Sequence, residues 1–68
     1  MIERGMTYEQ ILRMVETNGW EILEDAPGEE DGVTWREMTI WQDDHAVGVG
    51  VDDNEGVYEL VYIPRWAL

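Results

Sequence analysis

The chain has 68 residues, which is enough for a single domain, residues 1–68, and no more. It contains no cysteine, so disulfides and thiolate zinc sites are excluded, and no apolar run is long enough to cross a bilayer. Its 16 acidic residues stand against 4 arginines, for a formal net charge of −12. This balance disfavours direct binding to nucleic acid or to an anionic membrane, because phosphate binding requires a cationic surface.

The first predicted element is an amphipathic helix over residues 8–18. Its apolar face is formed by Tyr8, Ile11, Leu12 and Val15, which repeat with helical spacing. Thr7 is a favourable N-cap, and Gln10 three residues later completes a capping box. Gly19 can adopt the left-handed conformation that ends a helix.

Four strands are predicted to follow the helix. They cover residues 20–25, 33–42, 47–51 and 57–63. The segments between them, residues 26–32, 43–46 and 52–56, are rich in Gly, Asp and Asn and predict turns, the first of them long and mobile. Pro64 ends the last strand, and the tail 65–68 is expected to pack back through Trp66 and Leu68.

Alternation along the strands assigns their side chains to two faces. In the second strand, Val33, Trp35 and Trp41 share one face, and Met38 and Ile40 share the other. In the last strand, Val57, Val61 and Ile63 share one face, and Tyr58, Leu60 and Tyr62 share the other. Gly48 and Gly50 leave a strip of the sheet surface without side chains, here called the glycine lane. Tyr58 and Tyr62 could lie across it, or the backbone of a partner could approach it.

Short loops between strands predict antiparallel neighbours. The expected fold class is therefore α+β, with one N-terminal helix packed on an antiparallel meander of three to four strands. A single helix covers only one face of such a sheet. The second face is covered by the loop 26–32 and the tail, by a second copy in a homodimer, or by a partner.

Acidic residues are concentrated in the predicted turns. The candidate partner-binding acids are Glu29, Glu30, Asp31, Asp43, Asp44, Asp52, Asp53 and Glu55. They could be solvated turn residues, since turns favour Asp for backbone reasons alone, or ligands of a hard cation such as calcium. If the turns converge in space, they could instead imitate the charge of nucleic acid. The spacing of residues 52–56 does not match a calcium-binding EF-hand loop, so no metal site is predicted.

Catalytic chemistry has few candidate residues in this sequence. The chain has no serine and no cysteine to act as a nucleophile, and no glycine loop with a lysine to hold phosphate. Its single histidine, His45, lies in a predicted acidic turn. We therefore expect a protein that is not an enzyme, with no catalytic residues and no cofactor.

Residues 11–22, ILRMVETNGWEI, look like the first helix and strand of the HicA-type toxins, small RNases with a double-stranded-RNA-binding-like fold. Members of that family carry a catalytic histidine after the first strand, whereas the corresponding residues 25–32 here contain none. The net charge of −12 also disfavours RNA binding. The resemblance therefore implies the helix-then-meander arrangement and not the activity.

In size, charge and layout the whole chain is similar to small phage-encoded inhibitors, including anti-CRISPR proteins, some of which are DNA mimics. That resemblance implies a stoichiometric inhibitor that occupies a nucleic-acid-binding surface. We expect a basic, nucleic-acid-binding protein as partner, in the cytoplasm, which would be the host cytoplasm for a phage protein. The candidate anchors of the contact are Trp35, Trp41, Tyr58 and Tyr62.

A different class of function explains the same composition. High Asp and Glu with no lysine is also typical of a small structural or interaction domain from a salt-adapted or high-GC organism, where acidity serves solubility. Such a domain could be a homodimer through its uncovered face. The two interpretations differ in whether the acidic residues gather on one side of the folded sheet.

Overall fold

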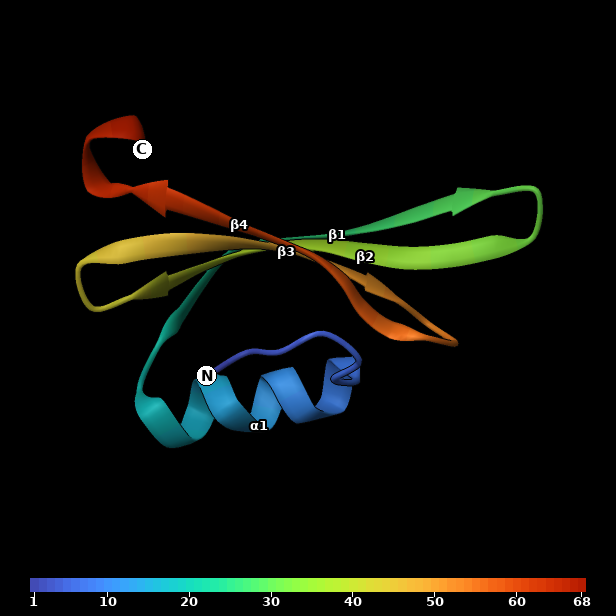
Figure 1. Ribbon diagram of the computed structural model, residues 1–68, viewed down its shortest axis with the longest axis horizontal. Coiled ribbons are helices and arrows are strands. Elements are labelled where there is room, and N and C mark those ends of the chain that lie inside the picture. Colours follow the sequence, from blue (N-terminus) through green and yellow to red (C-terminus); the bar gives the residue numbers. More distant parts are fainter.

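The computed structural model describes residues 1–68, in which one helix is followed by four strands and a short 3-10 helix. The elements are α1 (Tyr8–Asn18), β1 (Glu21–Glu30), β2 (Val33–Gln42), β3 (His45–Asp52), β4 (Gly56–Pro64) and η1 (Arg65–Ala67). The strands form one antiparallel sheet in the order β1-β2-β3-β4, and α1 lies across one of its faces (Figure 1). The predicted α+β class, with an N-terminal helix on a meander, is confirmed.

The helix begins and ends where its capping residues predict. The Thr7 side chain accepts the N–H of Gln10, and the Gln10 side chain accepts the N–H of Thr7, which is the complete capping box. Gly19 takes a left-handed φ of 68°, and the N–H of Trp20 donates to the Val15 carbonyl. These bonds satisfy backbone groups that a helix otherwise leaves open at its two ends.

The first strand is longer than predicted. Residues 26–30, expected to be part of a turn, continue β1 and pair with β2 as far as Glu30 opposite Val33. The connection needs only Asp31 and Gly32, which both have positive φ, 50° and 82°. An Asp-Gly pair favours this two-residue hairpin turn, and Pro27 is tolerated because β1 is an edge strand. The predicted mobile turn over residues 26–32 was therefore wrong.

One hydrophobic core lies between α1 and the sheet. Its buried members are Ile2, Ile11, Val15, Met38, Ile40, Val49, Val51 and Val57. Ile11 of the helix and Ile40 of β2 are fully buried, so the centre of the core is the contact of α1 with β2 and β3. The core residues of α1, β2 and β3 follow the predicted helical and strand periodicities. Val57 of β4 does not, and Ile2 precedes the predicted elements.

A β-bulge in β4 explains the exception. Gly50 pairs with Glu59, but Val51 pairs with Val57, so Tyr58 is an extra residue in β4. A bulge changes the face to which the residues before it point. Val57 therefore joins the core on the helix side, and Tyr58 lies over Gly50 on the opposite side.

For this reason the predicted faces of the last strand were wrong at Val57 and Tyr58, whereas the other residues are grouped as predicted. Val61 and Ile63 lie on the same side as Tyr58, because both approach the Cβ direction of Gly48 within 3.6 Å. Leu60 packs against the core, and Tyr62 stacks on His45 at the helix side of the sheet. Of the two tyrosines that could lie across the glycine lane, only Tyr58 does so.

The sheet surface opposite α1, here called the open face, is largely uncovered. The side chains that form it include Trp35, Glu37, Trp41, Tyr58, Glu59 and Val61. The tail does not cover it as predicted: Trp66 is 87% exposed and Leu68 is also exposed. Residues 26–32 cannot cover it either, because they form strand and hairpin turn within the sheet itself. In Figure 1, η1 is the only helix on that side of the sheet, and it lies at the end of β4.

The N-terminal segment is fixed to the edge of β4. Gly5 donates its N–H to the Val57 carbonyl, and Val57 donates its N–H to the Met6 carbonyl, both at 2.9 Å. The approach is close because Gly56 has no side chain: a Cβ there would lie 2.5 Å from the Gly5 carbonyl oxygen. This contact seats the segment before α1 and so places the helix on the sheet.

Two glycine substitutions distinguish the effect of the Gly56–Gly5 contact on stability from the effect of a positive φ. Gly32 and Gly56 have nearly equal φ values, 82° and 81°, but only at Gly56 would an added Cβ meet neighbours within 4 Å. Gly32→Ala is expected to lower the unfolding free energy by about 1 kcal/mol for its φ alone. Gly56→Ala is expected to cost at least about 1 kcal/mol more, because the methyl group displaces the Gly5 backbone. Urea unfolding followed by circular dichroism measures both, and equal losses would contradict the packing argument.

Candidate partner-binding surface

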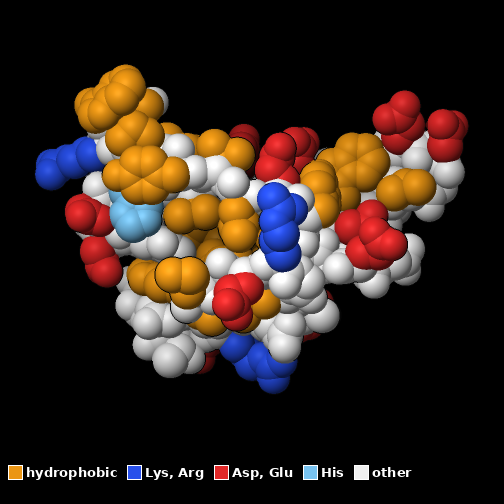
Figure 2. All heavy atoms as spheres, viewed as in Figure 1, with side chains coloured by type: hydrophobic (Ala, Val, Ile, Leu, Met, Phe, Trp, Pro, Cys, Tyr) orange, Lys and Arg blue, Asp and Glu red, His pale blue; other side chains and the backbone are white.

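The topology brings two acidic turns together. In an antiparallel meander, successive turns alternate between the two ends of the sheet, so the β1–β2 and β3–β4 turns share one end. The acids at that end, here called the acidic end, are Glu29, Glu30, Asp31, Asp52, Asp53 and Glu55. Asp43 and Asp44 lie in the β2–β3 turn at the opposite end. Figure 2 shows acidic side chains gathered at the tip of the β1–β2 hairpin, which is on the right in this view.

Hydrogen bonds hold the two acidic turns in place. The Oδ1 atom of Asp52 accepts the backbone N–H groups of Asn54 and Glu55 at 2.8 and 2.9 Å, which orders the β3–β4 turn. Asp53 accepts a hydrogen bond from the Thr34 hydroxyl and donates its own N–H to the Thr34 carbonyl. Since Thr34 belongs to the β1–β2 hairpin, these bonds tie the β3–β4 turn to its neighbour.

The two arginines near the acidic end are already engaged, Arg4 by the Tyr58 carbonyl and Arg36 by Asp25. The Arg36 Nε donates to Asp25 at 2.7 Å, and the guanidinium carbon lies 4.8 Å from the centre of the Tyr8 ring. The Tyr8 hydroxyl donates to the other oxygen of Asp25 at 2.5 Å. This network joins α1, β1 and β2 on the helix side. Arg36 also attracts nearby Asp53 at longer range, but no acid of the acidic end forms an ion pair.

The candidate aromatic anchors fall into two pairs. Trp35 and Tyr58 lie on the open face, Trp35 over Gly28 and Tyr58 over Gly50, toward the acidic end. Trp41 lies on the same face near the opposite end, where it pairs with Ala46. Tyr62 is 66% exposed on the helix side, with its ring centre 4.9 Å from that of His45. Trp35 and Tyr58 are therefore the two that adjoin the acidic end.

Sequence reasoning missed three glutamates of the open face. Glu37 and Glu59 are both register partners of Gly50, and Glu24 pairs with Thr39 one position along the same face. With Gly48 and Gly50 they line a shallow hollow at the centre of that face. Counting by two from Trp35 already places Glu37 on this face, but Glu59 required knowledge of the bulge.

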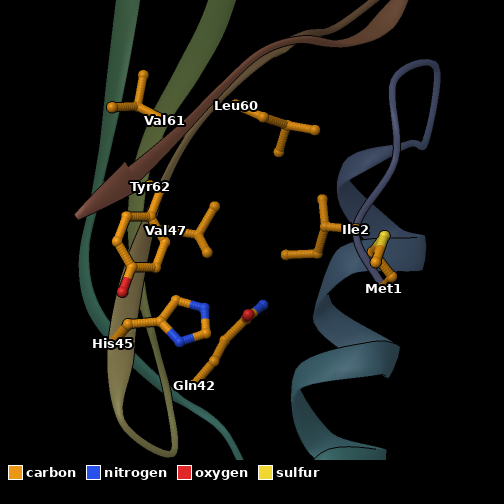
Figure 3. Close-up of a pocket in the computed structure, with 8 residues that line it drawn as sticks. All are labelled: Met1, Ile2, Gln42, His45, Val47, Leu60, Val61 and Tyr62. Atoms are coloured by element: carbon orange, nitrogen blue, oxygen red, sulfur yellow. The ribbon is translucent and has the colours of Figure 1, made fainter. Parts of the chain in front are cut away.

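A second hollow lies on the helix side, between the N-terminal segment and the β3–β4 hairpin (Figure 3). Its volume is about 330 Å³, and its lining is mostly apolar. His45 lies at its rim, and its Nδ1 is 2.7 Å from the Asp44 carboxylate, which lowers the pKa of Asp44. The lining offers an imidazole and the Tyr62 phenol, but no serine or threonine hydroxyl.

Two further classes of site have no matching geometry. No group of three or more acidic or histidine side chains is arranged to hold a metal ion. None of the helices has the length and apolar character needed to cross a membrane.

The chain matches no protein-family model, curated protein or solved structure. Its function must therefore be argued from the surface itself.

The Tyr8–Asp25 bond predicts a pH dependence of stability. The pKa of Tyr8 is raised above its usual value of 10, first by its hydrogen bond to Asp25, then by burial and by the Asp25 charge. Folding therefore favours the protonated phenol. This stabilisation is fully present below pH 10 and is lost as pH rises through the higher folded-state pKa.

Tyr8→Phe is expected to lower the unfolding free energy by about 1 kcal/mol at neutral pH, because it removes one hydrogen bond to a carboxylate. The difference from the unmodified protein should shrink above pH 10, where Tyr8 ionises in the unfolded chain. Urea unfolding at several pH values measures this. Tyr62→Phe is the control, since the Tyr62 hydroxyl makes no hydrogen bond. A deficit of Tyr8→Phe that does not change with pH would contradict the assignment.

Proposed function

We propose that this protein is a non-enzymatic inhibitor whose acidic end occupies a basic, nucleic-acid-binding surface of a partner protein. The observation that carries the proposal is that two turns at one end of the sheet bring together six acids, none of which forms an ion pair. Grouped charge of one sign produces a directional field, which steers association with an oppositely charged surface. An even distribution would serve solubility without favouring any orientation.

The arrangement of these charges supports imitation of a phosphate backbone. Neighbouring strands lie about 4.8 Å apart and alternate residues of a strand about 6.8 Å apart, so turn acids repeat on a scale of several ångströms. Each strand of DNA presents one charge for about every 3.4 Å of axis. The two acidic turns are held near each other, because Asp53 of one turn is hydrogen-bonded to Thr34 of the neighbouring hairpin.

The proposal places the partner in the cytoplasm, which is the host cytoplasm if the protein is encoded by a phage. Trp35 and Tyr58 border the acidic end and would supply apolar contact area beside the charges. Aromatic anchors commonly provide most of the affinity of an interface, whereas charge supplies rate and specificity. The protein would act by stoichiometric occupancy.

Capture from lysate tests this function with two charge-matched variants. The first, Glu29→Gln with Glu30→Gln and Asp31→Asn, removes three charges from the acidic end. The second, Glu16→Gln with Glu21→Gln and Asp43→Asn, removes three charges elsewhere. The unmodified protein and the second variant are expected to retain a nucleic-acid-binding protein that duplex DNA displaces, and the first variant is expected to lose it. Retention that resists DNA, or equal loss in both variants, would refute the proposal.

The uncovered open face and the charge of −12 favour a second candidate, an acidic domain of a salt-adapted organism that dimerises through this face. Glu37 and Glu59 weigh against such a dimer, because two copies meeting there would bring like charges together.

Thermal unfolding at low and at molar salt separates the two functions. Self-repulsion among acidic groups is screened by salt, so some stabilisation by salt is expected in either case. The inhibitor is expected to be folded and monomeric at about 0.15 M salt, the physiological ionic strength. A protein that folds or dimerises only as salt approaches molar concentration would support the salt-adapted domain instead.

A further inference from the structure

We infer that a hollow at the acidic end of the open face binds the guanidinium group of an arginine side chain from the partner protein. Its lining residues are Val33, Trp35, Asp52, Glu55 and Tyr58, and its volume is about 280 Å³. The choice of a protein as the source of the arginine rests on the proposed function. The preference of the hollow for a guanidinium group is argued from its lining residues and does not depend on that function.

The sheet fixes the two aromatic walls. Trp35 is the register partner of both Gly28 and Asp52, and its indole lies over Gly28, where any side chain would displace it. Tyr58 is held in the same way over Gly50: a Cβ at that glycine would lie 2.7 Å from the phenol ring. Each ring therefore rests on backbone. Tyr58 nevertheless remains 46% exposed, so part of its ring is available to a ligand.

Neither of the two carboxylates in the hollow has a cationic partner, and hydrogen bonds hold that of Asp52 in place. Asp52 uses its Oδ1 atom to accept two backbone N–H groups, and no hydrogen bond or ion pair engages its Oδ2 atom. The Glu55 carboxylate has no partner. Arg36 is bound to Asp25, and Arg4 donates to the Tyr58 carbonyl at the strand edge without lining the hollow. The chain thus builds an anionic aromatic hollow and supplies no cation to it.

Arginine is the side chain that matches this set of groups. Its planar guanidinium stacks on aromatic rings, donates to carboxylates in a fixed fork and loses its hydration more readily than an ammonium. A neutral aromatic ligand would leave the carboxylates unpaired, and an anion would be repelled. Burial and the charges of Glu37, Glu59 and Asp52 raise the pKa of Tyr58, which is consistent with a negative potential at this wall.

The test uses three short peptides as probes: acetyl-Gly-Arg-Gly-amide and the same peptide with lysine or with citrulline, which has the shape of arginine without its charge. Nuclear magnetic resonance follows the indole N–H signal of Trp35, assigned with Trp35→Phe. The arginine peptide is expected to shift this signal saturably, and the lysine peptide to bind at least about threefold more weakly. The citrulline peptide should have no effect. Equal shifts from arginine and citrulline, or stronger binding of lysine, would overturn the inference.

Matched substitutions separate local contact from overall charge. Asp52→Asn keeps the Oδ1 acceptor that orders the turn, and Glu55→Gln leaves the backbone N–H of residue 55 free to donate to it as before. Each is expected to weaken arginine-peptide binding about fivefold or more, whereas Asp43→Asn, at the opposite end, should leave it unchanged. Equal weakening by all three would overturn the inference. So would shifts of the Trp35 signal caused by raising the protein concentration alone, since these would assign the hollow to a second copy.

Failure here is distinguishable from failure of the proposed function. Peptide binding without DNA-displaceable capture of a protein would retain the arginine site and reject the inhibitor. Such capture without peptide binding would retain the inhibitor and reject the arginine site.

Discussion

One constraint organises this molecule: a single helix of 11 residues, with the N-terminal segment before it, covers only one face of a four-stranded sheet. Ile11 and Val15 bury against β2 and β3, and this contact uses the apolar side of the meander. At this chain length little further apolar surface can be hidden, because a small domain buries a low fraction of its surface. The opposite side of the sheet therefore stays in contact with solvent, and the residues placed there must be compatible with water or serve a contact. Trp35, Tyr58 and Val61 occur on that side together with Glu37 and Glu59.

The sequence predicts the parts of the fold that depend on local chemistry. The helix is predicted correctly because Thr7, Gln10 and Gly19 act on backbone groups within a few residues of themselves. The end of β1 is not, because Pro27 and Gly28 suggest a turn, whereas the Asp31–Gly32 pair alone suffices for the hairpin. The bulge at Tyr58 could not be inferred from alternation. It arises where β4 must match β3 while Val57 bonds to the N-terminal segment, which is a tertiary contact.

For the candidate surface, the sequence predicts which turns lie together but not the contacts of the side chains around them. Once a meander is assumed, the alternation of turns between two ends places the β1–β2 and β3–β4 acids together and leaves Asp43 and Asp44 apart. Composition alone does not show that Arg36 pairs with Asp25 and lies against Tyr8, so that no acid of the acidic end has an arginine as its ion-pair partner. The pairing of Trp35 with Tyr58 around one hollow depends on two glycines and on the bulge, so it follows only from the structure.

Ten of the 16 acids lie elsewhere on the chain, but the six of the acidic end are difficult to explain by stability alone. Gathering six carboxylates at one end raises the free energy of the folded state by like-charge repulsion. Two of them cannot move apart, because Asp53 is hydrogen-bonded to Thr34 and Asp52 to the backbone of its own turn. Solubility would be served equally by acids dispersed over the surface. The glutamates of the open face have a separate consequence, because charged residues on an exposed sheet oppose association with a second copy. Together these features favour a partner whose charge is opposite to that of this chain. Such a partner would relieve the repulsion at the acidic end and cover the aromatic side chains beside it.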